Sequence, residues 1–160
     1  MHPKRKIIRL QDFDYGSVNA YFITICVKDF RCVFGEVRQG VMGLSELGNT
    51  AAIYLQNIPE IYTHLVLGEW IVMPNHVHAI IEITAPVQSA SPKNQTISVS
   101  HIINQYKGAV KKWSNKNNFN DFEWQSRFYD HVIRDNKSYH HIQNYIASNT
   151  LCWEGDRYHL

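Results

Sequence analysis

Two histidines separated by one residue, His76 and His78, begin a segment whose composition is typical of a β-strand. The segment reads "HVHAIIEI", and its β-branched and apolar residues favour an extended conformation. Side chains alternate between the two faces of a strand, so both imidazoles should lie on one face, close enough to ligate a single ion. The other face is entirely apolar, and we expect it to be buried: Val77, Ala79, Ile81 and Ile83.

A histidine pair at this spacing is not specific to metal binding in a chain with nine histidines. His76 and His78 are equally consistent with ordinary residues on the polar face of a strand, and a cupin could also contain such a pair. A histidine-triad hydrolase is disfavoured, because it needs a third histidine two residues further on, where Ile80 stands. A reactive metal site would also need a further ligand and a nucleophile from elsewhere in the chain.

The last predicted helix offers both of these groups. In "SYHHIQNYIASNT", the residues Tyr139, Ile142 and Ile146 recur at helical spacing and should form its buried stripe. Tyr145 and Asn149 are four residues apart, which places a phenol and an amide one turn apart on one face. Such a pair could present an attacking oxygen and a metal-binding carbonyl to one point. The alternative is that Tyr145 is a core or rim residue, as most tyrosines on amphipathic helices are.

The elements that must position these groups can be read along the chain. Strand-like composition marks residues 20–27, two short runs flanking a turn at Gln39-Gly40, and residues 64–73 and 76–83. Helical periodicity marks a segment that Ser45 begins and Pro59 ends, residues 97–113, and residues 137–148, the last capped by Asp135 or Asn136. Hairpins together with helices, without strict β–α alternation, predict an α+β fold with a mainly antiparallel sheet.

Length and composition predict one globular domain. The chain has 160 residues, of which 19% are charged. We expect a single domain over residues 1–160, with a basic N-terminal arm at 1–19 and a flexible loop at 85–96, where Pro, Ser, Gln and Asn accumulate. Three cysteines without a Cys-x-x-Cys pair indicate a reducing compartment. No signal peptide or run of about 20 apolar residues is recognisable, so we expect a cytoplasmic protein.

Basic residues gather in two places although the net charge is only +2. These places are the N-terminal arm and the predicted helix at 97–113: Lys4, Arg5, Lys6, Lys107, Lys111 and Lys112. Both groups could contact the phosphates of a nucleic acid. A frayed terminus and a solvated helix face are the alternatives.

Three motifs in order resemble the single-tyrosine HUH transposases (His-hydrophobic-His), and among them the REP-associated tyrosine transposases. The motifs are "WIVMPNHVHAII", "SHIINQYKGAVKKW" and "WQSRFYDHVIRDNKSYHHIQNYIASN", and the similarity extends from roughly Phe22 to Trp153. The resemblance implies a ferredoxin-like α+β sandwich of the HUH endonuclease type. In that fold, helices pack on a mainly antiparallel sheet that carries the histidine pair on a central strand.

The resemblance also implies roles for the site residues. His76, His78 and Asn149 would bind a divalent metal ion, Mg²⁺ or Mn²⁺, and Tyr145 would attack a phosphate of single-stranded, hairpin-bearing DNA. The products would be a 5′-phosphotyrosine linkage and a free 3′-hydroxyl, the intermediate of DNA transposition. Family members usually continue from this Asn into Pro, whereas Thr150 follows here, which leaves the end of the helix less well defined.

Two other functions fit parts of the pattern. A transposase that has lost catalysis would still bind hairpin DNA, although the complete set of His, Tyr and Asn residues argues against it. A small-molecule metal hydrolase would use His76 and His78 with water as nucleophile, and would leave Tyr145 without a role. The sequence leaves open whether the chain acts as a monomer or as a homodimer.

Overall fold

The computed structural model describes residues 19–85 and 97–159. Nearly all of the predicted basic arm and of the predicted loop lies outside the described residues, and so do Lys4, Arg5 and Lys6. The elements follow in this order: β1 (Asn19–Cys26), β2 (Gly35–Arg38), β3 (Val41–Leu44), α1 (Glu46–Gln56), α2 (Ile58–Ile61), β4 (Leu65–Met73), β5 (His76–Ile83), α3 (Val99–Lys116), β6 (Tyr129–Ile133) and α4 (Asn136–Ala147). Short 3₁₀ helices span Lys28–Phe30 and Trp153–Gly155.

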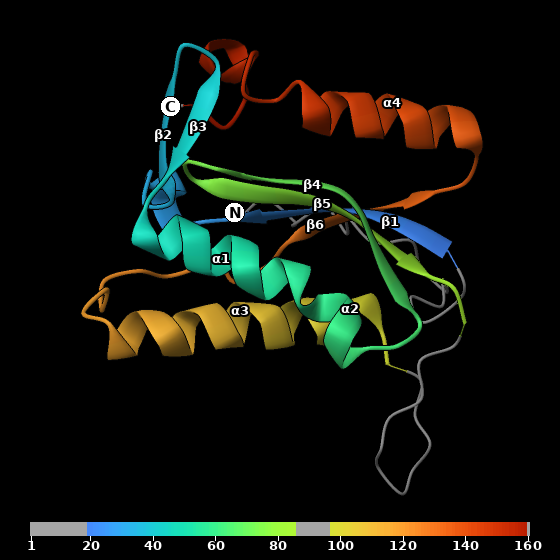
Figure 1. The fold of residues 1–160 in the computed structure, drawn as a ribbon, viewed down its shortest axis with the longest axis horizontal. Coiled ribbons are helices and arrows are strands. Elements are labelled where there is room, and N and C mark those ends of the chain that lie inside the picture. Colours follow the sequence, from blue (N-terminus) through green and yellow to red (C-terminus); the bar gives the residue numbers. More distant parts are fainter. Residues whose placement is uncertain (1–18, 86–96, 160) are drawn as a thin grey trace, which may run out of the picture.

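Four strands form one antiparallel sheet in the order β4-β5-β1-β6 (Figure 1). Because α1 lies between β1 and β4 and α3 between β5 and β6, these elements follow as β-α-β-β-α-β. This is the ferredoxin-like arrangement, and it confirms the predicted α+β fold. The β2–β3 hairpin is inserted before α1, and α4 follows the last strand of the sheet.

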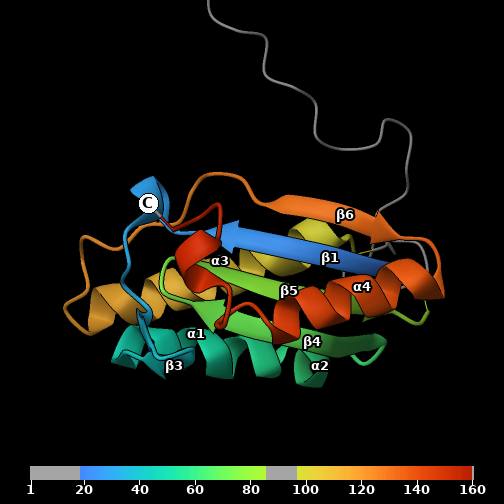
Figure 2. The same cartoon turned by 90° about the horizontal axis from the view of Figure 1, so that it is seen from above.

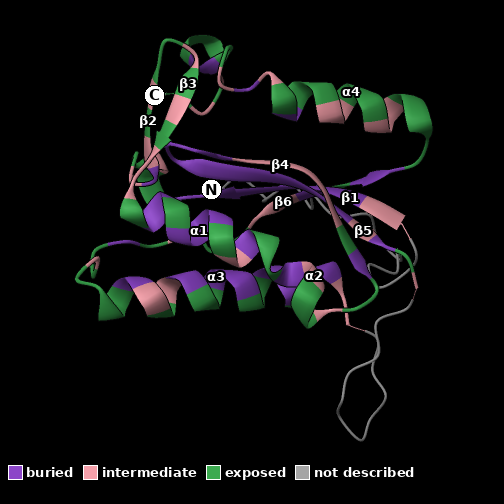
Figure 3. Cartoon of the chain, in the orientation of Figure 1, coloured by how far each residue is buried: buried purple, intermediate pink, exposed green. Residues whose placement is uncertain are grey.

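The sheet separates two apolar layers. The helices α1, α2 and α3 cover one face, and α4 covers the other (Figures 1 and 2). The larger core lies beneath α1 and α3 and includes the predicted apolar face of β5: Val77, Ala79, Ile81 and Ile83. The smaller core lies beneath α4 and joins four buried side chains: Phe22, Ile80, Ile133 and Ile146. As a result, β5 is buried on both faces, the histidine face included (Figure 3).

Local sequence signals explain the turns and the first helix. The β2–β3 hairpin turns at Gln39 and Gly40, whose φ angles of 51° and 74° suit a two-residue hairpin turn. Ser45 caps α1 by accepting a hydrogen bond from the Gly48 N–H at 3.0 Å. The prediction that Pro59 ends this helix is wrong. The first helix ends at Gln56, and Pro59 lies in the first turn of α2, where its missing N–H has no helical partner to lose.

Contacts at both of its ends fix α4 on the histidine face of the sheet. At its N-terminus, the Asp135 carboxylate accepts a hydrogen bond from the Ser138 N–H at 2.8 Å, as the capping prediction requires. One turn later, the Tyr139 hydroxyl donates to Glu82 on β5 at 2.5 Å. Gly68 on β4 leaves room for this phenol, because a Cβ there would lie 2.8 Å from the Tyr139 oxygen. Toward its C-terminus, Ile146 enters the smaller core.

Two further features bear on the sequence-based expectations. The three cysteines are free: Cys26 is buried, whereas Cys32 and Cys152 are exposed. None of the helices in the described part of the chain is long and apolar enough to cross a membrane.

Candidate active site

His76 and His78 lie side by side on the face of β5 that α4 covers, which confirms that they share one face of the strand. Their ring centroids are 4.5 Å apart. In the register of the sheet they face Cys26 and Thr24 of the adjacent strand β1. Neither side chain is exposed to solvent. In such a dry interior, each ring nitrogen must find a partner inside the protein or a bound ligand.

Asn75 determines which nitrogen of His76 carries the proton. The Nδ1 atom of His76 lies 2.8 Å from Oδ1 of Asn75. The amide nitrogen of Asn75 donates to the backbone carbonyls of Phe30 at 3.1 Å and of Tyr158 at 2.7 Å. Its oxygen is therefore the atom that faces His76, and an oxygen can only accept. The His76 proton is thus on Nδ1, and Nε2 presents a lone pair to the site.

His78 is held in a similar way from β1. Its Nδ1 atom lies 2.8 Å from the hydroxyl oxygen of Thr24. A hydroxyl can donate or accept, so this contact orients the ring without fixing its tautomer. The ring packs at 5.2 Å between centroids against Phe22, and its Nε2 atom points toward α4.

Two buried atoms at this place have no hydrogen-bond partner, Nε2 of His76 and Oδ1 of Asn149. Asn149 is 1% exposed. Buried polar atoms are nearly always paired, and leaving one unpaired costs about 1–3 kcal/mol. Both atoms offer a lone pair and no proton, which is the chemical character of a metal ligand.

The donor set suits a divalent cation only if the amide takes part. Within residues 19–85 and 97–159, no three His, Cys, Asp or Glu side chains are placed to hold an ion. The two imidazoles therefore need the amide oxygen of Asn149 as the third protein donor. Because all three groups are neutral, they would leave the charge of a cation uncompensated and available to a substrate. The residues at this point fit a divalent ion such as Mg²⁺ or Mn²⁺.

The surroundings keep both imidazoles neutral. Burial lowers the pKa of His76 to about 4, and a smaller opposing effect comes from the Asp156 carboxylate. Burial likewise holds the pKa of His78 well below its ordinary value, and His76 and Arg157 lower it further. Neutral imidazole is the form that binds a metal ion, and for His76 no proton has to leave Nε2 before binding.

Tyr145 projects from α4 toward the histidines. Its oxygen lies 3.4 Å from Nε2 of His78, and its ring stands edge-on to Phe22 with 6.1 Å between centroids. The neighbouring Ile146 is completely buried and fixes the rotation of the helix about its axis. Tyr145 is 37% exposed, so a substrate can reach the phenol. Burial and the nearby Asp156 carboxylate raise the pKa of Tyr145, so the phenolate is scarce at neutral pH unless a cation is near.

Asn149 lies in a turn just beyond α4, not on the helix itself. The helix ends at Ala147, and the Asn149 N–H donates to the Ile146 carbonyl at 3.1 Å. This short-range bond tightens the last turn and keeps the amide on the side of Tyr145. The Asn149 amide takes this position although Thr150 follows it, where the transposases that the motifs resemble usually have proline.

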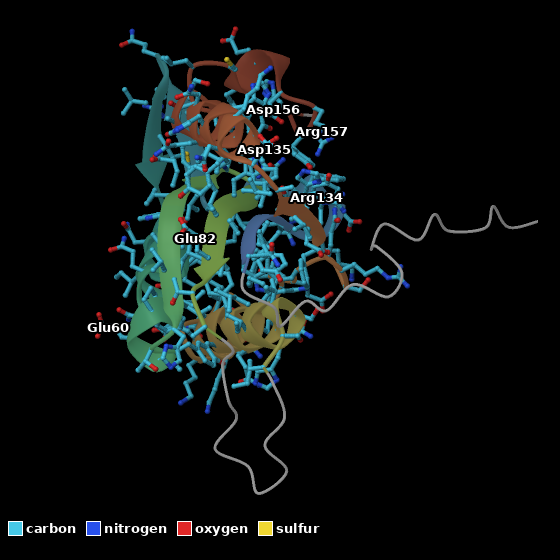
Figure 4. The ribbon with its side chains drawn as sticks, turned by 90° about the vertical axis from the view of Figure 1, so that its right-hand side faces the viewer. Glu60, Glu82, Arg134, Asp135, Asp156 and Arg157 are labelled. Carbon is cyan, nitrogen blue, oxygen red and sulfur yellow. The ribbon has the colours of Figure 1, made fainter. Side chains whose placement is uncertain are left out.

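The C-terminal segment 153–159 closes the site, and sequence reasoning missed it. The ring of Tyr158 lies 4.6 Å from that of His76 and 5.9 Å from that of His78, between centroids. Arg157 donates to the Tyr158 hydroxyl at 2.5 Å, and Asp156 accepts from Nδ2 of Asn149 at 3.2 Å. Figure 4 shows Asp156 and Arg157 together beside α4. The segment has no periodic pattern of apolar residues, so no sequence signal predicts that it packs against β5.

The structure corrects the prediction that Lys107 lies on a DNA-binding surface. Lys107 is only 9% exposed, and its ammonium group donates to the carbonyl of Gln125 at 2.7 Å. The ammonium group of Lys111 donates to two carbonyls of the same connection between α3 and β6, those of Asn120 and Phe122. Both lysines thus hold this connection in place. Lys112 is exposed on α3, which lies on the face of the sheet opposite α4 (Figure 1).

Comparisons with known proteins agree with this architecture. No family model matches the sequence. An uncharacterized protein of Haemophilus influenzae is 35% identical over 168 residues, which cover 98% of this chain and 93% of that protein. A REP-associated tyrosine transposase bound to a REP hairpin has a TM-score of 0.62 at 20% identity, covering 89% of this chain and 73% of that chain. A putative transposase from Deinococcus radiodurans R1 has a TM-score of 0.51 at 16% identity, covering 87% and 95%.

The structural likeness shows that this chain has the fold of the tyrosine transposases, which confirms the resemblance of the sequence motifs at the level of the fold. The extent of its identity to the Haemophilus protein shows that the chain belongs to the same family as that protein.

The contacts of Lys107 predict a structural role. Lys107→Met keeps most of the side-chain volume but leaves the Gln125 carbonyl without its partner, and should lower the free energy of unfolding by about 1–3 kcal/mol. Lys112→Met makes the same charge change at an exposed position and should change the free energy of unfolding by less than about 0.5 kcal/mol. Urea denaturation followed by circular dichroism measures both. Equal effects of the two substitutions would contradict the structural role.

The hydrogen bonds of Asn75 predict the tautomer of His76. Nitrogen-15 NMR of the metal-free protein should show the His76 proton on Nδ1, because Asn75 can only accept from the ring. Asn75→Ala should lose this preference, and the exposed control Asn144→Ala should keep it. A wild-type His76 with its proton on Nε2 would rule out the arrangement.

Proposed function

We propose that this protein is a metal-dependent endonuclease and strand transferase, a transposase that nicks and rejoins single-stranded, hairpin-bearing DNA through a 5′-phosphotyrosine intermediate. One observation supports this function above the others. The oxygen of Tyr145 lies 3.4 Å from Nε2 of His78, the ring of His76 lies 4.5 Å from that of His78 between centroids, and Nε2 of His76 and Oδ1 of Asn149 are buried without a partner. A nucleophile and a set of metal donors therefore meet at one point.

His76, His78 and Asn149 are the residues that would hold Mg²⁺ or Mn²⁺. The amide oxygen suits either ion, whereas the imidazole nitrogens are softer donors than the oxygen ligands that Mg²⁺ prefers. When bound there, the ion would polarise the scissile phosphate and stabilise the departing 3′-oxygen.

The reaction proposed for Tyr145 is a phosphoryl transfer to its phenolic oxygen. A bond forms between the Tyr145 oxygen and the phosphorus, and the bond from phosphorus to the 3′-oxygen breaks. The phenol gives up one proton and the 3′-oxygen takes one up, so no proton is gained or lost overall. A later attack of a 3′-hydroxyl on the phosphotyrosine rejoins the strand and restores the phenol. Since the linkage conserves the energy of the phosphodiester, no nucleotide cofactor is needed.

Arg157 supplies fixed positive charge beside the nucleophile. Burial and Asp156 raise the pKa of Tyr145, and the Asn149 amide and then the Arg157 guanidinium oppose them with smaller effects. A planar guanidinium also matches the geometry of a phosphate, and Arg157 is exposed enough to bind one. We therefore place Arg157 on the phosphate backbone of the bound strand, at or next to the scissile phosphate.

Further DNA contacts remain predictions. Lys112 offers an exposed ammonium group, whereas Lys4, Arg5 and Lys6 lie outside the described residues. A hairpin as ligand is supported by the structural neighbour that binds a REP hairpin.

A small-molecule hydrolase that uses water would leave the placement of Tyr145 without a purpose, and a protein that only binds DNA would have no use for the unpaired donors of His76 and Asn149.

The decisive test is a covalent adduct. Incubated with Mn²⁺ and a labelled single-stranded hairpin oligonucleotide, the protein should form a complex that survives SDS. Tyr145→Phe should abolish the adduct but preserve the fold and DNA binding, because it removes a single oxygen. Tyr54→Phe removes the same oxygen on α1, on the opposite face of the sheet, and should still form the adduct. An adduct that persists in Tyr145→Phe would assign the nucleophile to another residue.

Loss of the metal should stop cleavage but not DNA binding. His76→Ala removes one of the two imidazole donors, so Mn²⁺ affinity measured by calorimetry should fall by about 10-fold or more and the adduct should disappear. His101→Ala, at an exposed position on α3, should change neither quantity. Adduct formation by wild-type protein in excess EDTA would contradict a metal-dependent reaction.

A further inference from the structure

Asp156 links the C-terminal segment to Asn149. One carboxylate oxygen of Asp156 accepts a hydrogen bond from Nδ2 of Asn149 at 3.2 Å. The other accepts from the backbone N–H of Tyr158 at 2.7 Å. The Tyr158 carbonyl in turn accepts from Asn75, so the segment is tied to the start of β5 on the far side of the site as well. Asp156 therefore occupies a fixed position beside the candidate metal donors.

This contact decides which end of the Asn149 amide faces the histidines. The oxygen and nitrogen of an amide have nearly the same size, so shape alone leaves two orientations open. An ionised carboxylate can only accept hydrogen bonds, and one oxygen of Asp156 lies 3.2 Å from the Asn149 amide. The nitrogen of Asn149 must therefore face Asp156, and its oxygen is left buried and unpaired on the other side.

The reversed orientation would be unfavourable at Asp156 and would prevent metal binding. It would place the amide oxygen against a carboxylate, so that two acceptors face each other without a proton between them. It would also point N–H bonds toward the site, where a cation would be repelled. Asp156 thus excludes the orientation of Asn149 that cannot bind a metal ion.

We infer that Asp156 is the positioning residue of the metal site: it holds the Asn149 amide with its oxygen toward His76 and His78. This inference rests on the function proposed above, because it takes these three residues as the metal ligands. Asp156 is not itself counted as a ligand, because within the described residues it forms no metal-holding group of three His, Cys, Asp or Glu side chains with the two histidines.

The alternative is that Asp156 acts by charge alone. A carboxylate near the site attracts any cation, and its effect on the pKa of His76 shows that its field reaches the imidazole. Replacing Asp156 would then weaken metal binding whatever residue stands at position 149. If Asp156 acts by orienting the amide, the loss of metal affinity on replacing it should depend on the residue at position 149. If it acts by charge, the loss should not, and a double-mutant cycle separates the two explanations.

The test uses the full-length protein, MnCl₂ as the probe, and isothermal calorimetry for affinity. Asp156→Asn keeps the shape and can still accept from the Tyr158 N–H, but it can also donate to Asn149, so the amide gains its second orientation. We expect Mn²⁺ affinity to fall by about 10-fold or more. Thermal unfolding monitored by circular dichroism checks that the fold is retained, and electron paramagnetic resonance of unbound Mn²⁺ gives an independent affinity.

The same substitution is then made in the Asn149→Asp variant. There the side chain at position 149 is a carboxylate with two oxygens, so either orientation presents an oxygen to the histidines. There, Asp156→Asn places an amide donor next to the new carboxylate, and should leave Mn²⁺ affinity unchanged or improve it. The same loss in both backgrounds would show that charge alone is involved and would overturn the inference. Unchanged affinity in Asp156→Asn alone would overturn it too, while Mn²⁺ binding and adduct formation by wild type would still support the proposed function. Wild-type protein that neither binds Mn²⁺ nor forms the adduct would overturn both.

Discussion

The candidate site depends on the dry interface between α4 and the polar side of β5. Water cannot satisfy the ring nitrogens of His76 and His78 there, so each needs a partner from the protein. Asn75 and Thr24 supply partners for the two Nδ1 atoms. The atoms on the opposite side of the rings are left to Tyr145 and to whatever binds between them. Burial thus does two things at once: it keeps the imidazoles neutral and it gives them fixed directions.

The same packing places the nucleophile. A ferredoxin-like sheet ordinarily needs helices on one face only, and here α1, α2 and α3 already cover that face (Figure 2). In the described part of the chain, the additional helix α4 is held by the small core around Ile80 and Ile146 and by the bond from Tyr139 to Glu82. Because Tyr145 precedes the most buried residue of α4, its direction is determined by the core and not by a surface contact. A rigid helix is better suited than a loop to hold an attacking oxygen at a set distance.

Much of the fold and part of the site follow from local patterns in the sequence. Alternation along "HVHAIIEI" is enough to put His76 and His78 on one face, because it depends on the geometry of one strand. The four-residue spacing of Tyr145 and Asn149 is not enough alone, because α4 ends at Ala147 and a turn places Asn149. The exposed lysine face expected on α3 failed for Lys107, since its partner is a carbonyl 18 residues away in the chain. Asp156 and Tyr158 could not be foreseen for the same reason: their role exists only after a segment without periodicity folds back on β5.

The two amide hydrogen bonds of Asn75 have a thermodynamic consequence. One side chain holds the His76 imidazole, the Phe30 carbonyl and the Tyr158 carbonyl, so docking of the C-terminal segment and orientation of the imidazole share one free energy. Linkage makes such sharing reciprocal. Any ligand that binds the oriented imidazole more tightly also stabilises the docked segment, by the same factor by which docking improves its own affinity. Amide hydrogen exchange in residues 156–159 therefore reports on events at His76, although these residues lie far away from it along the chain.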